Sequence, residues 1–250
     1  MPETLIGVPN LAFLLDIDGT LLDLAPTPRD VRVPTSLRHT LERLQARSDG
    51  AVALVSGRSL ADIDLIFHPL HLSAIGGHGA EIRYHANGHP DQRLGASLDD
   101  ELKRRLAEIA ASGRGIIVED KGYSLALHYR LAPEKKQAVW DAVDAVIADL
   151  PPKSVEILPG KAVIEIKKSG FDKGTAIREL MRKAPFSGRR PVFVGDDTTD
   201  EAAFRVLPEF NGVGISVGRL VPGVSRRFET PTDVRRWLER IAKTNGSRQA

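Results

Sequence analysis

LAFLLDIDGTLLD, residues 11–23, joins an uninterrupted apolar run to two aspartates, Asp16 and Asp18, that are one residue apart. A short apolar run without polar alternation predicts a strand buried on both faces, as in a parallel sheet. Functional groups of such sheets gather beyond the carboxyl ends of the strands. Residues i and i+2 share a strand face, so we expect the carboxylates of Asp16 and Asp18 to converge.

Two converging carboxylates repel each other unless one is protonated or a cation lies between them. Mg2+ is a hard cation that prefers oxygen ligands, so the pair predicts a magnesium site. The alternative is a polar strand end in which an aspartate caps the next turn. The buried strand before the pair and Gly19-Thr20 after it favour the metal site.

The composition excludes several classes of protein. The chain has 250 residues, of which 42% are apolar, with a net charge of +2 and no cysteine. A chain without cysteine has no disulfides, no thiol catalysis and no cysteine-ligated zinc. The charge balance gives no reason to expect nucleic acid or a membrane as a partner. The sequence has no signal-peptide pattern or membrane-length apolar run, so we expect a soluble, cytoplasmic protein. We further expect a monomer.

The order of the predicted elements indicates an α/β core that is interrupted once. Apolar strands alternate with helices before residue 97 and after residue 168, whereas helix-strand-strand occurs twice between them. The fold class is therefore α/β, a Rossmann-like parallel-sheet core with an inserted α+β domain. We assign residues 1–96 and 169–250 to the core and residues 97–168 to the inserted domain.

A second acidic strand end follows in VFVGDDTTDE, residues 192–201. Charge matching at a helix N-terminus explains Asp200 or Glu201. It does not explain Asp196, which lies at the tip of the strand. Placed beside Asp16, Asp196 would complete an oxygen-rich metal site.

Two further motifs predict contacts to an anion. In LVSGRS, residues 54–59, Ser56 and Gly57 either present a hydroxyl and backbone N–H groups to an anion or form a turn with a serine cap. In GFDKGTAIREL, residues 170–180, Lys173 lies at a helix start, where cations are disfavoured. We expect an anion or a carboxylate such as Asp16 or Asp196 in front of it. These parts together suit phosphoryl transfer.

D-x-D-G-T, S-G-R, the lysine and G-D-D-x-x-D, in this order, resemble the haloacid dehalogenase (HAD) superfamily of phosphatases. The inserted domain resembles that superfamily's larger, C2B type of cap. VSGRSLADI, GGHGAEIR, VEDKGYSLALHYR, PGKAVIEIK, GFDKGTAI and GDDTTDEAAF further resemble trehalose-6-phosphate phosphatases, over roughly residues 10–245. This resemblance implies Mg2+-dependent hydrolysis of trehalose 6-phosphate, a small-molecule substrate.

The resemblance also implies roles for residues of the core. Asp16 would attack the phosphorus and become an aspartyl phosphate, and Asp18 would act as the general acid and base. Mg2+ would be held by the Asp16 carboxylate, the Asp18 backbone carbonyl and Asp196. Ser56, Gly57 and Lys173 would bind the phosphate, and Asp200 would orient Lys173 or a metal-bound water.

In the inserted domain, Glu119, Lys121 and Glu165 match the positions at which the family holds the distal glucose. The alternative is an exposed sheet face with alternating charges. His128, Arg130 and Lys161 are further candidates for contacts with the sugar.

Three other functions remain open on the sequence. The first is a related HAD phosphatase for another sugar phosphate, such as sucrose phosphate or mannosyl-phosphoglycerate. The second is a non-catalytic regulator that binds a phosphosugar. The third is a phosphomutase or phosphotransferase, which would use the same core. A regulator that has lost its catalytic activity is expected to lack Asp16 or Asp18, and both are present.

Overall fold

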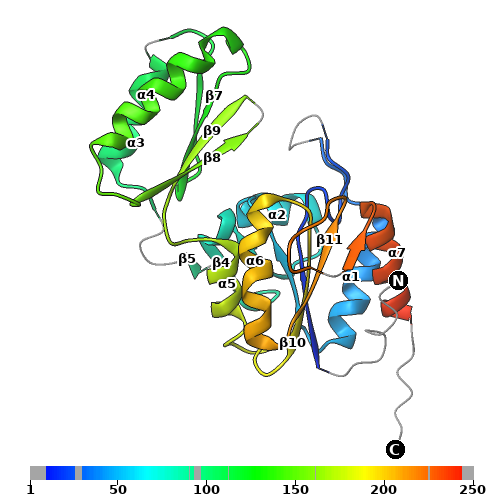
Figure 1. The fold of residues 1–250 in the computed structure, drawn as a ribbon. Coiled ribbons are helices and arrows are strands. Elements are labelled where there is room, and N and C mark those ends of the chain that lie inside the picture. Colours follow the sequence, from blue (N-terminus) through cyan, green and yellow to red (C-terminus); the bar gives the residue numbers. More distant parts are fainter. Residues whose placement is uncertain are drawn as a thin grey trace, which may run out of the picture. The chain divides into compact units, whose positions relative to one another are not determined.

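The computed structural model describes residues 10–25, 30–89, 91–92, 97–111, 113–160, 162–224 and 226–243. The chain divides into two compact units, Met1–Asp91 with Asp172–Ala250, and Gln92–Phe171. We call the first unit the core and the second the cap (Figure 1).

The core is built on one sheet, with strand order β12-β11-β10-β1-β2-β3-β4-β5. Neighbouring strands from β12 to β3 are parallel, and β4 is antiparallel to β3. The parallel arrangement brings the carboxyl ends of β1, β2 and β10 to one edge. The strands are β1 Leu11–Leu15, β2 Val52–Val55, β3 Ser73–Gly76, β4 Glu81–Arg83, β5 Asp91–Gln92, β10 Arg190–Gly195, β11 Val213–Val217 and β12 Arg226–Phe228.

Helices cover both faces of this sheet, which explains the uninterrupted apolar run of β1 (Figure 1). Phe13 and Leu15 of β1 pack in an apolar cluster with α1, α2 and α7, whereas Ala12 and Leu14 pack in a second cluster with α5 and α6. The helices are α1 Thr35–Arg47, α2 Leu60–Phe67, α5 Lys173–Leu180, α6 Glu201–Val206 and α7 Pro231–Lys243, with short 3-10 turns η2 Gly77–Gly79, η4 Thr198–Asp200 and η5 Leu207–Phe210.

The cap is one antiparallel sheet of order β6-β7-β9-β8 with two helices on a single face. Leu125, Leu127, Ile164 and Ile166 are buried in an apolar cluster with residues of these helices. Side chains alternate along a strand, so the residues between them line the opposite face. The elements are α3 Asp100–Ala111, β6 Ile117–Asp120, β7 Ser124–His128, η3 Pro133–Lys135, α4 Lys136–Ala148, β8 Val155–Gly160 and β9 Val163–Lys168.

The predicted parallel-sheet core and separate antiparallel layer are confirmed. The sequence pattern did not predict β5 and β12, the strands at the two edges of the core sheet, which have two and three residues. Strands this short have too few residues for an apolar period. Among the described residues, no helix is long and apolar enough to cross a membrane.

Candidate active site

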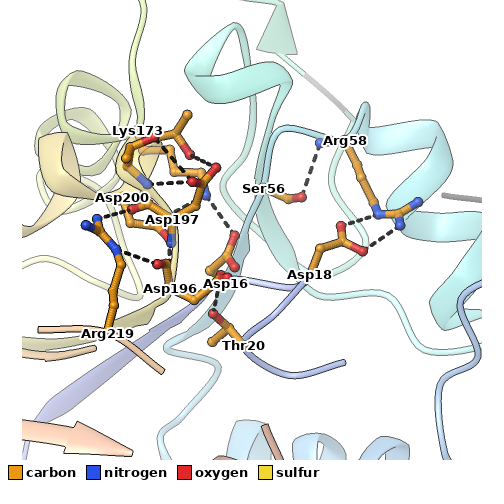
Figure 2. Close-up of polar contacts among 12 residues, drawn as sticks. Asp16, Asp18, Thr20, Ser56, Arg58, Lys173, Asp196, Asp197, Asp200 and Arg219 are labelled. Atoms are coloured by element: carbon orange, nitrogen blue, oxygen red, sulfur yellow. Dashed lines mark hydrogen bonds and ion pairs between the residues drawn. The ribbon is translucent and has the colours of Figure 1, made fainter. Parts of the chain in front are cut away.

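A buried lysine joins two carboxylates at the carboxyl edge of the core sheet (Figure 2). Lys173 Nζ donates hydrogen bonds to Asp16 Oδ1 at 2.7 Å and to Asp200 Oδ1 at 2.6 Å. The side chains of the three residues are 3%, 6% and 0% exposed, respectively. Asp16 directly follows β1, and Asp200 ends the turn η4 after β10. Strands distant in sequence but adjacent in the sheet therefore bring the cluster together.

A capping box fixes Lys173 at the first position of α5. Asp172 Oδ1 accepts the Thr175 backbone N–H at 2.7 Å, and Thr175 Oγ1 accepts the Asp172 N–H at 3.1 Å. A cation at a helix N-terminus is disfavoured by the helix dipole. Burial alone would also lower the pKa of Lys173, but the carboxylates of Asp16 and Asp200 raise it above its usual value, so the ammonium stays charged. The two carboxylates thus explain why a lysine occupies the first position of α5.

Asp196 adds a third carboxylate to this cluster. Oxygen atoms of Asp16, Asp196 and Asp200 lie within 4.8 Å of one another. Burial and the nearby Asp200 raise the pKa of both Asp16 and Asp196. One ammonium cannot neutralise three carboxylates, so the residues present fit a hard cation with oxygen ligands.

Two side chains hold Asp196 and its loop in place, and a glycine lets Asp196 approach closely. Thr20 Oγ1 donates to Asp196 Oδ1 at 3.0 Å, and the Arg219 guanidinium donates to the backbone oxygens of Asp196 and Asp197 at 2.7 and 2.9 Å. Gly19 has a φ of +80°, and a Cβ there would lie 2.1 Å from Asp196 Oδ2. Glycine is therefore required at position 19 by both the turn and the close approach of Asp196.

Asp18 differs from the expectation that its carboxylate converges with that of Asp16. The strand β1 ends at Leu15, so the i, i+2 rule for a strand does not apply at Asp18. The Asp18 side chain turns away from Asp16 and toward Arg58 (Figure 2). Arg58 Nε and Nη2 donate to Asp18 Oδ2 and Oδ1, both at 2.6 Å, in a two-bond ion pair.

Ser56 and Gly57 form the turn between β2 and α2. The side chain of Ser56 is buried, and its Oγ accepts the Arg58 backbone N–H at 3.1 Å. The hydroxyl keeps its O–H as a donor. The turn η2 supports this loop, because Gly77 N donates to Arg58 O at 2.8 Å and His78 N donates to Ser56 O at 3.1 Å. A Cβ on Gly57 would lie 2.4 Å from the His78 ring.

The three candidate cap residues share the open face of the cap sheet. Glu119 pairs with Ala126 across β6 and β7, and Ala126 pairs with Glu165 across β7 and β9. Glu119, Ala126 and Glu165 therefore form one row across the sheet. Glu165 accepts hydrogen bonds from Lys121 Nζ at 2.9 Å and from Ser124 Oγ at 2.6 Å.

The other cap candidates have different positions. Glu119 Oε2 lies 2.9 Å from His128 Nε2. Arg130 is exposed, next to the end of β7. Lys161 lies outside the described residues.

The comparison with protein families decides the assignment. The trehalose-phosphatase family model matches residues 14–232. The chain belongs to the trehalose-phosphatase family. A probable trehalose-phosphate phosphatase of Sinorhizobium fredii is 41% identical over 217 residues, covering 85% of this chain and 80% of that protein. The trehalose-6-phosphate phosphatase of Escherichia coli is 37% identical over 246 residues, covering 96% and 91%.

Solved structures place this trehalose-phosphatase family member among the HAD folds. A trehalose-6-phosphate phosphatase related protein is similar with a TM-score of 0.75 and 26% identity, over 93% of this chain and 96% of that chain. The HAD-superfamily phosphatase BT1666 of Bacteroides thetaiotaomicron is similar with a TM-score of 0.60 and 14% identity, over 94% and 96%, which indicates the fold alone. The predicted HAD fold class is confirmed.

Sequence reasoning did not single out three polar residues of this trehalose-phosphatase family member. Thr20 and Arg58 lie inside the D-x-D-G-T and S-G-R motifs. Assigning a role to every polar residue of each motif would have identified them. Arg219 follows β11 and belongs to no motif. Its one signal is its place just after the carboxyl end of a strand next to β10.

Proposed function

We propose that the chain hydrolyses trehalose 6-phosphate to trehalose and inorganic phosphate through an aspartyl phosphate on Asp16, with Mg2+ as cofactor. The observation that carries this proposal is the buried Asp16–Lys173–Asp200 cluster at the carboxyl edge of a trehalose-phosphatase core. Catalysis of phosphoryl transfer comes almost entirely from positioning the nucleophile and from neutralising the charge on the phosphoryl group. A carboxylate fixed by an ammonium inside an acidic cluster provides both.

The reaction has two steps. In the first, an oxygen of Asp16 attacks the phosphorus, the bond from phosphorus to the sugar oxygen breaks, and Asp18 gives its proton to that oxygen. In the second, water attacks the phosphorus of the aspartyl phosphate, and Asp18 takes a proton from the water. The bond between phosphorus and Asp16 then breaks, which releases phosphate and restores the Asp16 carboxylate.

Other core residues position the phosphate. Lys173 keeps the Asp16 side chain in one orientation and, as a charged ammonium, stabilises phosphoryl oxygens. Ser56 would bind the phosphate through its hydroxyl, and Gly57 lies beside it in the same turn at the end of β2, the strand next to β1. Asp200 accepts Lys173 through Oδ1 and the N–H groups of Asp196 and Asp197 through Oδ2, so it positions both the lysine and the metal loop.

The carboxylates of Asp16 and Asp196 and the backbone carbonyl of Asp18 would hold Mg2+. When bound, the ion neutralises charge on the phosphoryl group and on the acidic cluster. Thr20 and Arg219 keep Asp196 at the edge of the sheet for this purpose.

Glu119, Lys121 and Glu165 would recognise the sugar. Their charged groups lie on the face of the cap sheet opposite the helices, with the small side chain of Ala126 between the two glutamates. Carboxylates and an ammonium accept from and donate to the several hydroxyls of a sugar. We also expect a cytoplasmic monomer, whose mass light scattering on the purified protein would measure.

The decisive experiment measures released phosphate from a panel of sugar phosphates with Mg2+ or with EDTA. We expect trehalose 6-phosphate to be preferred over sucrose phosphate and mannosyl-phosphoglycerate, with no turnover in EDTA. Asp16→Asn should abolish turnover, while Asp23→Asn, a change to an exposed aspartate of the same stretch, should not. Full activity of Asp16→Asn, or a preference for another sugar, would contradict the proposal.

A further inference from the structure

The ion pair between Arg58 and Asp18 occupies both oxygens of the Asp18 carboxylate. Among the described residues, the oxygen atoms of Asp16, Asp196 and Asp200 gather within 4.8 Å, and Asp18 is not part of that group. The Asp18 side chain is 31% exposed, against 6% for Asp16. A carboxylate held in this way cannot at the same time give a proton to a leaving oxygen beside Asp16.

The backbone at both ends of the ion pair is fixed. Gly19 N donates to Leu22 O at 2.8 Å, so the turn that follows Asp18 is closed. Arg58 donates its N–H to Ser56 Oγ and accepts the Gly77 N–H on its carbonyl oxygen. Release of Asp18 is therefore a rotation of side chains, and no strand or helix has to move.

Arg58 has room to move aside when the ion pair breaks. A cavity of about 650 Å³ is lined by Arg58 together with Val31, Arg38 and Asp62 of the neighbouring elements. The Arg38 guanidinium is held by three backbone oxygens, of Val33, Ile66 and Phe67, and is part of the wall. Because Arg58 lines this cavity, its side chain has open space beside it into which it can rotate.

We propose that Arg58 is a positioning residue that holds the Asp18 carboxylate withdrawn from the phosphoryl site, so that protonation of a leaving alcohol by Asp18 requires the Arg58–Asp18 ion pair to break. The proposal rests on the proposed function in one respect, the role of Asp18 as the general acid. A two-bond arginine-carboxylate pair is specific in geometry, and lysine cannot reproduce it because its ammonium is a single point charge.

The test compares two phosphate esters that need the acid to different degrees. The alcohol of n-butyl phosphate must be protonated as it leaves, whereas the phenolate of p-nitrophenyl phosphate leaves without a proton. For each ester, kcat/KM reports the steps up to the first irreversible one, which includes attack by Asp16. The ratio of the two values is independent of the folded fraction, because both are measured on the same sample.

The alkyl-to-aryl ratio is kcat/KM for n-butyl phosphate divided by kcat/KM for p-nitrophenyl phosphate. In Arg58→Met this ratio should rise by roughly threefold to tenfold, the range expected for one partly buried ion pair. Arg58→Lys should fall between Arg58→Met and the unchanged chain. In an Asp18→Asn background, Arg58→Met should leave the ratio unchanged. A ratio that falls would show that Arg58 orients Asp18 for reaction, and an unchanged ratio would show that Arg58 does not act through Asp18; either result overturns the proposal.

Neither ester contains trehalose, so the hydrolysis of trehalose 6-phosphate is tested independently of the role of Arg58. Hydrolysis of both esters without hydrolysis of trehalose 6-phosphate would contradict the proposed function. The alkyl-to-aryl ratio of the Arg58 variants would still decide the role of Arg58. An Asp18→Asn variant with the same alkyl-to-aryl ratio as the unchanged chain would remove Asp18 as the acid and overturn the Arg58 proposal with it.

Discussion

Asp200→Asn tests the cluster directly, because the Asp200 side chain is 0% exposed and both of its oxygens are engaged. Oδ1 accepts from Lys173 at 2.6 Å, and Oδ2 accepts the N–H groups of Asp196 and Asp197 at 2.9 and 3.0 Å. An asparagine has one oxygen and one NH2 group. With NH2 in place of Oδ2, two backbone N–H groups lose their acceptor; with NH2 in place of Oδ1, it faces the ammonium.

Either orientation leaves a buried donor without an acceptor and removes the negative charge opposite Lys173. We expect a loss of about 2–4 kcal/mol in the free energy of unfolding, from unsatisfied donors and a broken buried ion pair. For a chain of this size that loss lowers Tm by about 5–15 °C. Activity should also fall, because Lys173 and Asp196 lose their common support.

The assay is differential scanning calorimetry together with released phosphate. Asp233→Asn is the matched control, since Asp233 is a partly exposed carboxylate that accepts the Thr230 N–H at the start of α7. Asparagine keeps a side-chain oxygen for the Thr230 N–H, so this change mainly removes a charge from the first turn of α7 and costs at most about 1 kcal/mol. If Asp200→Asn shifts Tm no more than Asp233→Asn does, or keeps full activity, the account of the cluster is wrong.

Three further changes probe other parts of the site. Gly57→Ala places a Cβ 2.4 Å from the His78 ring, so kcat/KM should fall by about 10–100-fold while circular dichroism is unchanged. A normal kcat/KM would show that the loop adapts. Thr20→Val removes the hydrogen bond to Asp196, worth about 1 kcal/mol, so the Mg2+ concentration for half-maximal activity should rise about fivefold in a titration after EDTA treatment. An unchanged titration would show that the Thr20 hydrogen bond does not support metal binding by Asp196. Glu119→Ala should lower kcat/KM for trehalose 6-phosphate far more than for p-nitrophenyl phosphate, and equal losses would exclude a role in sugar recognition.

The core fold was predictable because its strands are buried on both faces. The run before Asp16 is apolar at every position, since alternate residues pack against helices on opposite faces of the sheet. The predicted alternation of strands and helices before residue 97 is met by α1 and α2, which follow β1 and β2. The edge strands β5 and β12 were not predictable, because pairing with a neighbour, rather than an apolar period, defines such short strands.

The site was predictable where a residue conflicts with its local structure. Lys173 at a helix start signalled a partner, and the structure supplies Asp16 and Asp200. The direction of the Asp18 side chain was not predictable, because Asp18 lies in a turn beyond β1. Its orientation depends on Arg58, which is forty residues away in the chain.

The row formed by Glu119, Ala126 and Glu165 has a consequence for how this family can vary. Lys121 N donates to Ser124 O at 2.9 Å and closes a tight turn between β6 and β7, with Gly122 at a φ of +82°. Removing or adding one residue here would slip β6 by one position, and a slip of one exchanges the two faces of a strand. The carboxylate of position 119 would then point into the apolar layer beneath α3 and α4. Insertions and deletions in this turn should therefore be rarer among active relatives than substitutions, because the length of the turn, more than the identity of its residues, keeps the acidic row in place.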